Sequence, residues 1–350
     1  MAVASGRTLT RDESEAAMTS VMEGEATAAQ LGALLAALHV RGETPDEIAG
    51  FATAMRARAV RVEVADGAID VVGTGGDRSN SINLSTLASL VAAGAGARVA
   101  KHGNRAASSA CGSADVLEAL GVKIDLGPEG VARCVEEAGI GFMFAPRFHP
   151  AMRHAGPVRR ELGIRTVFNL LGPLANPAGV RHYVLGVPSR EIGAKMAKAL
   201  GELAVTHALV VHGTDGLDEV SPSAETIIWE VRGDEMREMT LTPNEMKLER
   251  AARETILGGD APTNARVARD VLSGSKSGAR TAVLMNAAAA CYVAGLASTV
   301  REGVAVAAKA IDSGAARERL ERFVTTSQRI GAAEPGAGAP VQPSGARRTA

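Results

Sequence analysis

Apolar residues recur at helical spacing through the first sixty positions of the chain. One segment opens with Thr10 and Glu13, which have the spacing of a capping box. A second segment, rich in leucine and alanine, ends at Gly42, a residue suited to a helix C-terminus. A third starts with Thr44 as its cap and Pro45 at the first helical position. The pattern predicts a small N-terminal helical unit.

Near residue 67 the pattern changes to short apolar runs separated by turns and helices. Residues 68–72 look like a strand and are followed by GTGGD, while residues 84–96 look helical and 97–100 look like the next strand. Strand, loop, helix and strand make a βαβ unit, which favours a mostly parallel sheet flanked by helices. The alternation continues with a helix in SADVLEAL, strands at 141–145 and 205–213, and helices at 190–203 and about 281–327. The predicted class is α/β.

Two further segments bear on the location of the protein. The most apolar run, residues 281–297, is rich in alanine, is broken by Asn286 and is shorter than a membrane span, so we predict a buried helix. The first residues lack the apolar run of a signal peptide. The tail from about residue 331 to 350 is rich in Gly, Ala and Pro and is expected to be disordered. We expect a cytoplasmic protein without a membrane partner.

Composition narrows the classes of function. Lys plus Arg number 38 against 39 for Asp plus Glu, so there is no bulk positive charge to attract nucleic acid or anionic lipid. Aromatic residues make up only 3%, which leaves few platforms on which bases could stack. The three cysteines lack metal-binding spacing, and their odd number argues against a disulfide framework. Any anion site must therefore be local.

The glycine-rich loop after the first predicted strand is the first candidate site. Three glycines within four positions allow a tight turn that brings backbone N–H groups close to an oxyanion. Asn83, Ser85 and Thr86 stand at the start of the next helix, where N–H groups and the helix dipole favour phosphate. The segment matches neither a Walker loop nor GxGxxG. Phosphate binding and a plain turn with a helix cap both remain open from these residues.

A second polar group, KHGNRAASS, ends the next predicted strand. Lys101 and Arg105 could neutralise phosphate, Asn104 could bind a substrate, and Ser108 and Ser109 could add donors. Ligands of open α/β sheets bind at this edge. The alternative is a solvated loop that turns at Gly103, and the presence of two anion-binding loops at adjacent strand ends makes that alternative weaker.

Adjacent acids follow a later strand, in the segment HGTDGLDEVSP. Asp218 and Glu219 are expected at the same sheet edge, where carboxylates that point in different directions suit Mg²⁺ held partly through water and phosphate. Two solvated acids are the alternative.

A fourth segment, residues 144–177, places cations beside an apolar, proline-punctuated run. Arg159 and Arg160 must face different directions, so one could pair with a carboxylate while the other is solvated. For His149, Arg159 and Arg165, each taken singly, a structural role is the simpler interpretation. No Ser/His/Asp or Cys/His spacing stands out. The residues together indicate a Mg²⁺-assisted enzyme that acts on a phosphate ester.

These segments together resemble the anthranilate phosphoribosyltransferases. The similarity is carried by GTGGD, NLST, KHGNRAASS, GSADVLEALG, RTVFNLLGPLANP and DEVSP, and it spans the chain up to about residue 330. It implies transfer of phosphoribosyl from phosphoribosyl pyrophosphate (PRPP) to the amine of anthranilate, with release of pyrophosphate, in tryptophan biosynthesis. Arg78 is a departure, because the family often has glycine there.

The resemblance also implies an organisation for the chain. A helical domain, residues 1–67 joined by helices from about 155–185, would lie beside an α/β domain made of residues 68–154 and 186–330. A homodimer would form through the helical domain, and the active site would lie at the hinge between the two domains.

The resemblance assigns roles to individual residues. PRPP would be bound by Gly73, Thr74, Gly75, Gly76, Asp77, Asn83, Ser85, Thr86, Lys101, Ser109 and Ser113. Anthranilate would be bound by Gly73, His102, Asn104, His149, Arg159, Gly172 and Pro173. Ser85, Asp218 and Glu219 would hold Mg²⁺, with two ions expected per site. No side chain is assigned as a general base.

Two alternatives keep the same fold. A pyrimidine nucleoside phosphorylase would be expected to carry a longer phosphate loop with a lysine, which GTGGDRSN lacks. A nucleic-acid-binding paralogue would need a basic surface, and the net charge of the chain is -1.

Overall fold

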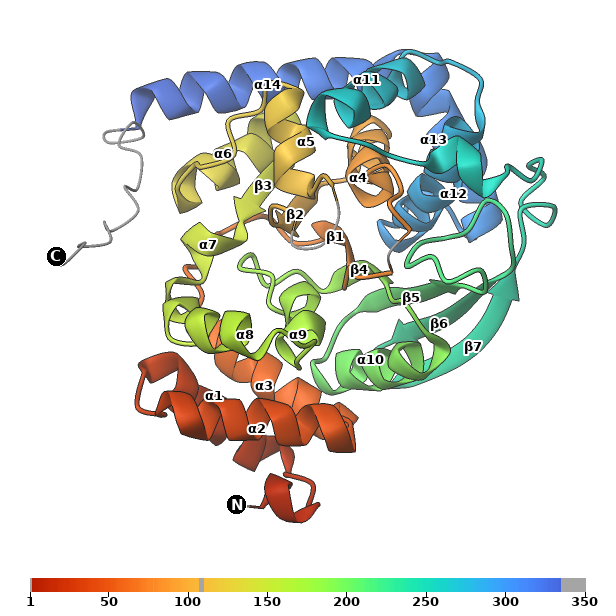
Figure 1. The fold of residues 1–350 in the computed structure, drawn as a ribbon. Helices are drawn as coiled ribbons and strands as arrows, with labels where there is room; N and C mark the ends of the chain where they lie inside the picture. The colour runs from red at the N-terminus through yellow and green to blue at the C-terminus, as the bar shows by residue number, and fades with distance from the viewer. Residues whose placement is uncertain (1, 78, 107–109, 335–350) are drawn as a thin grey trace, which may run out of the picture.

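The computed structural model describes residues 2–77, 79–106 and 110–334. At one end of the molecule lies a helical unit of α1 (Arg11–Glu23), α2 (Ala28–Arg41) and α3 (Pro45–Ala57) (Figure 1). The predicted capping box of Thr10 and Glu13 is present, and Thr44 caps α3 with Pro45 inside its first turn. Gly42 ends α2 with a positive φ of 84°. These predictions from spacing are confirmed.

A seven-stranded sheet forms the centre of the rest of the molecule, with the order β3-β2-β1-β4-β5-β6-β7. The strands from β1 to β5 run parallel, and β6 and β7 add antiparallel to β5. The strands are β1 (Ile69–Gly73), β2 (Val99–Gly103), β3 (Ile140–Phe144), β4 (His182–Gly186), β5 (His207–Gly213), β6 (Thr226–Arg232) and β7 (Glu235–Leu241). The predicted α/β class with a mostly parallel sheet is confirmed.

Helices cover the sheet and connect it to the helical unit. α4 and α12 pack against each other and against β1, while α10 packs against β5, β6 and α3. Trp229 of β6 lies against Gly193 of α10, where any side chain would collide with the indole. The helices are α4 (Leu84–Gly94), α5 (Ser113–Ala119), α6 (Pro128–Ala138), α7 (Ala145–Phe148), α8 (Gly156–Leu162), α9 (Phe168–Leu174), α10 (Arg190–Glu202), α11 (Ala261–Leu272), α12 (Gly278–Val293), α13 (Val300–Asp312) and α14 (Ala315–Ala333). Short 3-10 turns lie at Val3–Ser5, Pro150–Arg153 and Arg253–Ile256.

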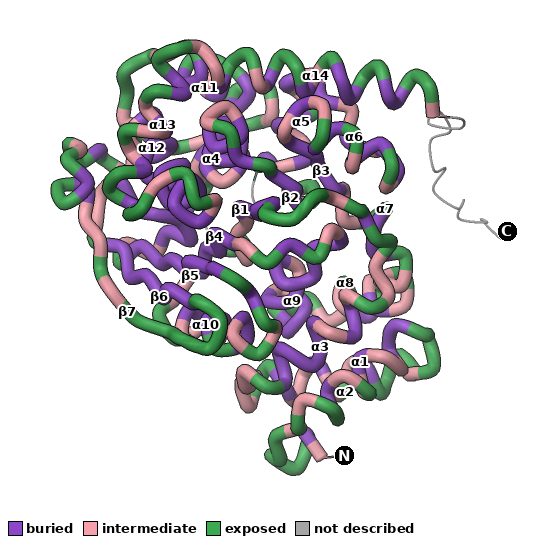
Figure 2. Tube along the Cα trace, turned by 180° about the vertical axis from the view of Figure 1, so that it is seen from behind, coloured by how far each residue is buried: buried purple, intermediate pink, exposed green. Residues whose placement is uncertain are grey.

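Several predicted boundaries are wrong. The run at 97–100 was expected to end before the basic residues, but β2 continues through Lys101 and His102 to Gly103, and both side chains are buried. Their polarity suggested a loop, whereas partners inside the fold make their burial tolerable. Ala145 starts α7 and does not end β3. In Figure 2, the tube is buried along much of the central sheet.

The C-terminal region is helical, as predicted for about 281–327, but its end differs from the prediction. Gly295 and Gly314 take positive φ angles of 74° and 82° and divide the region into α12, α13 and α14. Helix α14 continues through Ala333, so the expected disorder does not begin at residue 331. Residues 335–350 lie outside the described residues. The run at 281–297 is mainly the buried helix α12, as predicted.

The segment at 155–185 is divided between two parts of the molecule. Helix α8 contacts α2, and α9 contacts α3, so both lie on the helical unit (Figure 1). Strand β4, however, pairs with β1 and β5 in the middle of the sheet, and the expected boundary at residue 185 therefore falls inside a strand. Among the described residues no helix is both long and apolar enough to cross a membrane.

Candidate functional site

Three polar segments meet at the carboxyl edge of the parallel strands. The Gly75 N–H, in the loop after β1, donates to Asp218 Oδ2 at 3.0 Å, in the loop after β5. At the start of α4, the Ser85 N–H donates to Glu219 Oε1 at 3.1 Å. The Asp218 N–H donates to Asp77 Oδ2 at 3.4 Å. The structure thus brings together the glycine-rich loop, the start of α4 and the adjacent acids.

Glycine is required where these segments approach one another. Gly75 and Gly76 take positive φ angles of 68° and 80°, which other residues adopt with strain. A Cβ on Gly73 would lie 2.9 Å from Asp218 Oδ2. On Gly186, at the end of β4, a Cβ would lie 1.7 Å from the Asp218 backbone oxygen. Sequence reasoning missed Gly186, whose isolated position after a strand gave no signal.

The two adjacent acids are buried together with little compensation. Burial and the neighbouring Asp77 raise the pKa of Asp218 well above its usual value. Burial also raises the pKa of Glu219 to about 8, although the charge of Lys101 opposes this shift. The side chains of Asp218 and Glu219 each accept one backbone hydrogen bond. Such carboxylates would be stabilised by a cation that binds between them.

Lys101 is buried within the site, although it belongs to a polar segment that could have formed a solvated loop. Its side chain is 2% exposed, its ammonium donates to the Val71 carbonyl, and it lies 3.5 Å from Ser85 Oγ. Burial lowers the pKa of Lys101, whereas the charges of Asp70 and Glu219 raise it. Lys101 therefore lies beneath the site, where its charge acts on Ser85 and Glu219, and its role in binding PRPP phosphate stays a prediction.

Two more buried polar residues surround Lys101, and sequence reasoning missed both. The Asp70 carboxylate accepts from the His102 N–H at 3.3 Å and from Asn176 Nδ2 at 2.7 Å. Burial raises the pKa of Asp70 to about 6, and Lys101 is the largest opposing influence. A charged residue in the middle of the run AIDVV was the available signal for Asp70.

Asn286 holds the loop that carries the acids. Its Oδ1 accepts from the Val220 N–H at 2.9 Å, and its Nδ2 donates to the Val220 carbonyl at 3.0 Å. Val220 directly follows Glu219, so α12 fixes the backbone beside the carboxylates. The available signal for Asn286 is one asparagine in an alanine-rich run, where it marks only an interruption.

The other residues predicted to bind PRPP have mixed environments. Asn83 donates to the Cys111 carbonyl at 3.0 Å and accepts from Asn264 at 3.0 Å, so its side chain is engaged within the protein. Thr86 Oγ1 is buried and has no hydrogen-bond partner among the described residues. Ser113 donates to the Asn104 carbonyl at 3.2 Å. Ser109 and Arg78 lie outside the described residues.

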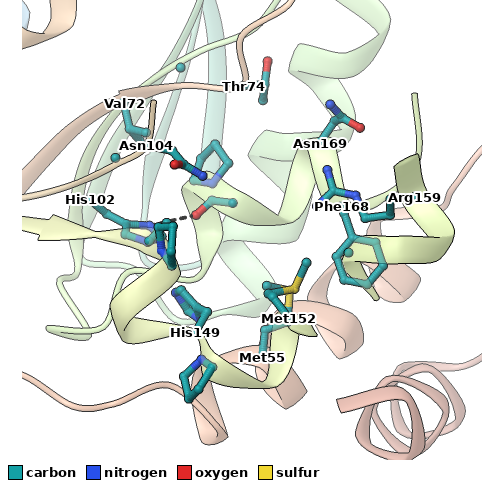
Figure 3. A pocket seen from close by; sticks show the side chains of 18 of the residues that line it. Met55, Val72, Thr74, His102, Asn104, His149, Met152, Arg159, Phe168 and Asn169 are labelled. Carbon is teal, nitrogen blue, oxygen red and sulfur yellow. Dashed lines mark hydrogen bonds between the residues drawn. The ribbon is translucent and has the colours of Figure 1, made fainter. Parts of the chain in front are cut away.

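A cavity of about 580 Å³ adjoins this edge and extends toward the helical unit (Figure 3). One wall comes from the strand ends of β1 and β2, and the other from the segment between α7 and α9. The residues predicted to bind anthranilate line it together: Gly73, His102, Asn104, His149, Arg159, Gly172 and Pro173. Sequence reasoning missed Met55, Met152, Phe168 and Asn169, which also line the cavity. Gly73 and Thr74 thus belong to both the phosphate loop and the cavity.

Two histidines lie side by side in this cavity. The ring centroids of His102 and His149 are 5.0 Å apart, and His102 Nδ1 lies 3.2 Å from the Gly172 carbonyl oxygen. Burial and the proximity of His149 lower the pKa of His102 to about 3, and burial lowers the pKa of His149 to about 4. Both rings are therefore neutral near pH 7. His102 Nε2 and His149 Nε2 lack hydrogen-bond partners among the described residues.

The arginines of the fourth segment separate into distinct roles. Arg159 lies in the cavity wall with its guanidinium carbon 5.0 Å from the Phe168 ring centroid, and burial lowers its pKa. It has no ion pair among the described residues, and the neighbouring Arg160 is exposed. Arg165 donates to the carbonyls of Gly75 and Gly76 at 3.3 and 3.4 Å, on the outer side of the loop.

Arg105 is a structural residue in this arrangement. Its guanidinium pairs with Asp115 at 2.9 Å and also with Glu118, both on α5, and lies over the Phe144 ring.

Within the described part of the chain, no group of three His, Cys, Asp or Glu residues is arranged to hold a metal ion. A metal ion bound by Asp218 and Glu219 would therefore need further oxygen ligands, such as water or phosphate.

Comparisons with known proteins agree with this geometry. Residues 1–59 match a model described as a glycosyl transferase family helical bundle domain, and residues 65–317 match the a/b domain of that family. Anthranilate phosphoribosyltransferase of Thermomicrobium roseum is 56% identical over 95% of this chain and 97% of its own. The solved structure of the Thermus thermophilus enzyme is 48% identical, with a TM-score of 0.89 over 94% of this chain and 100% of that one.

The enzyme of Saccharomyces cerevisiae has been solved in complex with PRPP and Mg and, separately, with 4-fluoroanthranilate. The yeast chain in the PRPP complex is 30% identical in sequence to this chain, with a TM-score of 0.86. The match covers 93% of this chain and 95% of the yeast chain. The 4-fluoroanthranilate complex is 29% identical, with a TM-score of 0.84, over 93% and 95%.

Proposed function

We propose residue roles for this chain on the basis of its family. The chain belongs to the anthranilate phosphoribosyltransferases, which are glycosyl transferases of tryptophan biosynthesis. The reaction joins the phosphoribosyl group of PRPP to the anthranilate amine and releases pyrophosphate. Family membership sets aside the two alternatives drawn from the sequence, a nucleoside phosphorylase and a nucleic-acid-binding paralogue. One observation carries the residue roles: Gly73 and Thr74 lie in the phosphate loop and also line the adjoining cavity.

The donor side binds PRPP through the loop after β1 and the start of α4. Backbone N–H groups of a tight glycine-rich turn and the positive end of a helix dipole both favour phosphate oxygens. The residues proposed to contact PRPP directly are Gly73, Thr74, Gly75, Gly76, Asp77, Asn83, Ser85, Thr86, Ser109 and Ser113. Lys101 contributes its charge from beneath Ser85.

Mg²⁺ is the cofactor that the carboxylate pair fits. Asp218 and Glu219 are buried, have raised pKa values and accept few hydrogen bonds. The charge of Lys101 offsets the effect of burial on Glu219 only in part, so the two carboxylates can provide oxygen ligands to a metal ion. Ser85 Oγ adds a neutral oxygen. We propose two ions per site, with water and PRPP supplying further oxygens. The bound ions neutralise the charge that develops on the departing pyrophosphate.

The cavity binds the acceptor. Arg159 lacks an ion pair among the described residues and can receive the anthranilate carboxylate, while Phe168 and the neighbouring apolar side chains match an aromatic ring. His102 and His149 present neutral rings, and Asn104, Gly172 and Pro173 complete the route. Because no side chain is assigned as a general base, positioning of the amine against the ribose carbon supplies much of the acceleration.

A fluorescence assay of the purified protein tests these roles. Anthranilate fluorescence should fall when protein, PRPP and Mg²⁺ are present together, and omission of PRPP or chelation of Mg²⁺ should prevent the change. Direct binding of anthranilate should be weakened in Arg159→Ala, while Arg160→Ala serves as the matched control on the same helix. Stable anthranilate fluorescence with folded wild-type protein would contradict the proposal.

We also propose that the protein is a cytoplasmic homodimer that associates through its helical unit. Val40 of α2 is 85% exposed, which leaves an apolar residue on the surface of that unit. Light scattering should give twice the mass of one chain, and Val40→Glu should shift the protein toward monomer. A monomer at micromolar concentration in the wild type would exclude this assembly.

A further inference from the structure

The backbones of β1 and β2 pair only briefly. Ile69 pairs with Val99, and the Ile69 N–H donates to the Arg98 carbonyl at 2.9 Å. On its other side β1 pairs with β4 over five residues, and β2 pairs with β3 over five. All residues of these strands are described, and β1 and β2 share no further pair, so the two strands separate as they approach the functional edge.

Side chains occupy the positions where the ladder between β1 and β2 stops. In a parallel pair continuing from Ile69 and Val99, the next bonds would join the Val71 N–H to the Ala100 carbonyl, and the His102 N–H to the Val71 carbonyl. The structure instead gives the His102 N–H to the Asp70 carboxylate. The Ala100 carbonyl accepts from Asn176 Nδ2 at 2.9 Å, and the Val71 carbonyl accepts from the Lys101 ammonium. Three of the four ladder groups are therefore bonded to side chains.

Replacing backbone ladder bonds between β1 and β2 with bonds to side chains does not stabilise the sheet. Asp70 is 0% exposed and Lys101 is 2% exposed, and removing two ionised groups from water costs free energy that backbone ladder bonds would not require. Asn176 donates to both Asp70 and Ala100 and so bridges the two strands. Asp70, Lys101 and Asn176 form a set that we name the polar wedge.

The wedge lies directly beneath the place where the two substrate regions adjoin. Beyond it, β1 continues into Val72, Gly73 and Thr74, and β2 continues into His102, Gly103 and Asn104; both sets line the same cavity (Figure 3). If the ladder closed, these two walls would approach to the usual distance between strands, about 4.8 Å. That spacing would leave no room for a ligand between them.

We propose that the polar wedge holds β1 and β2 apart and so sets the distance between the donor wall and the acceptor wall of the active site. Asp70 and Asn176 are then positioning residues, because they act through the backbone of His102 and Ala100 and lie outside the cavity lining. The inference rests on the proposed function, since it assumes that PRPP is bound at Gly73 and Thr74 and anthranilate beside His102 and Asn104.

The test compares two wedge variants. Asp70→Asn keeps the volume but removes the charge and places an amide donor where two donors already converge. Asn176→Ala removes the bridge between Asp70 and Ala100. We expect kcat to fall by about 10²-fold in each, because a displacement of about 1 Å costs that much. The KM values for PRPP and anthranilate should both rise, because both walls move, whereas Arg159→Ala should raise only that for anthranilate.

The control is a matched break elsewhere in the sheet. Glu230→Gln removes a buried carboxylate from a hydrogen-bonded network between β6 and α12, and Glu230 is not among the residues that line the cavity. All variants are assayed well below their melting temperatures, with the folded fraction measured by circular dichroism. If Asn176→Ala does not fold, Asp70→Asn carries the test.

The outcomes separate the wedge from the proposed function. A folded Asp70→Asn enzyme with wild-type kcat and KM values would overturn the wedge, as would an equal loss of kcat in Glu230→Gln. Wild-type protein that does not consume anthranilate would overturn the proposed function instead. A loss of kcat with both KM values raised, and near-normal kinetics in Glu230→Gln, supports the wedge.

Discussion

Two of the regions of the sheet that hold buried carboxylates differ sharply in their surroundings. Asp218 and Glu219 follow β5 at its carboxyl end, where each side chain accepts one backbone hydrogen bond and each pKa is raised. Glu230 lies in β6 beside Leu209, near the amino end of β5, and its side chain is 3% exposed. All three side chains have little contact with solvent, but only the first pair receives few hydrogen bonds from within the protein.

Glu230 is surrounded by donors. Tyr292 donates its hydroxyl at 2.6 Å, His207 Nε2 lies at 2.9 Å, and the guanidinium Nε atoms of Arg232 and Arg237 donate at 3.0 and 2.8 Å. Burial alone raises the pKa of Glu230, but these hydrogen bonds outweigh it and lower the pKa to about 2. A cavity of about 400 Å³ borders this cluster, yet its buried polar atoms already have partners within the described residues.

The difference shows how a buried carboxylate indicates its role. One whose hydrogen bonds come from within the protein stabilises the fold. One left with a raised pKa and few donors has the capacity to bind an external cation. The same substitution, Glu to Gln, should therefore have opposite consequences at the two ends of the sheet.

The largest expected effect is at the carboxyl end. Asp218→Asn combined with Glu219→Gln should lower kcat by about 10²- to 10³-fold, the usual result of removing electrostatic stabilisation of a transition state. The dependence of the rate on Mg²⁺ concentration should weaken. Steady-state kinetics over a Mg²⁺ titration measures both, and unchanged kinetics would remove these residues from the metal site.

Substitution in the cavity wall should have a smaller, selective effect. Arg159→Ala should raise KM for anthranilate by about 10- to 100-fold, since a hydrogen bond to a charged group contributes about 1.5–3 kcal/mol. KM for PRPP should change little, because Arg159 lies on the wall opposite the phosphate loop (Figure 3). Equal rises in both KM values would show that this arginine does not select the acceptor.

At the amino end, Glu230→Gln should reduce stability without a matching loss of activity. Glu230 is buried but Arg232 and Arg237 are more than half exposed, so the loss of the acceptor that they share with Tyr292 should cost about 1.5 kcal/mol. Urea denaturation measures the loss, and kcat at a temperature where the variant is folded should stay close to the wild-type value. A large fall in kcat would mean that the two regions are coupled.

The smallest effects concern pH, and they should differ in sign. The folded-state pKa of Glu230 is below its ordinary value of 4.5, so its contribution to stability is present above that pH and is lost as pH falls toward about 2. The folded-state pKa of Glu219 is about 8, so its ionisation costs the metal-free protein stability as pH rises from about 4.5 to 8.

Denaturation of the two Gln variants at several pH values without Mg²⁺ tests this contrast. Glu219→Gln should become increasingly more stable than wild type as pH rises toward 8. The deficit of Glu230→Gln should shrink as pH falls below 4.5. Parallel pH profiles for wild type and Glu219→Gln would show that Glu219 is not held in a cation-poor environment.

Local signals predicted much of the fold. Helix caps at Thr10 and Thr44 depend on side chains within one turn, so spacing alone identified them. The βαβ unit followed from a change in apolar period. The ends of β2 and β3 were misplaced because strand boundaries depend on which polar residues find partners, and the partners of Lys101 and His102 lie 16 to 70 residues away.

The candidate site was less visible in the sequence. Residues grouped in motifs, such as the glycine-rich loop and the acids at 218–219, were found because several functional types stand together. Asp70, Asn176, Asn286 and Gly186 were missed because each is single, and its role comes from a contact with a distant backbone. Phe168 and Met152 were missed because apolar residues fit a core as well as a cavity wall.

The sequence by itself determined the helical unit, the parallel α/β core and the identity of the polar loops, because caps, apolar periodicity and motifs act over short distances. Only the tertiary structure decided that Lys101 lies beneath the site, that Arg105 pairs with α5, and that β1 and β2 separate above Asp70. Each of these outcomes depends on which partner satisfies a buried polar group, and packing between distant segments makes that choice.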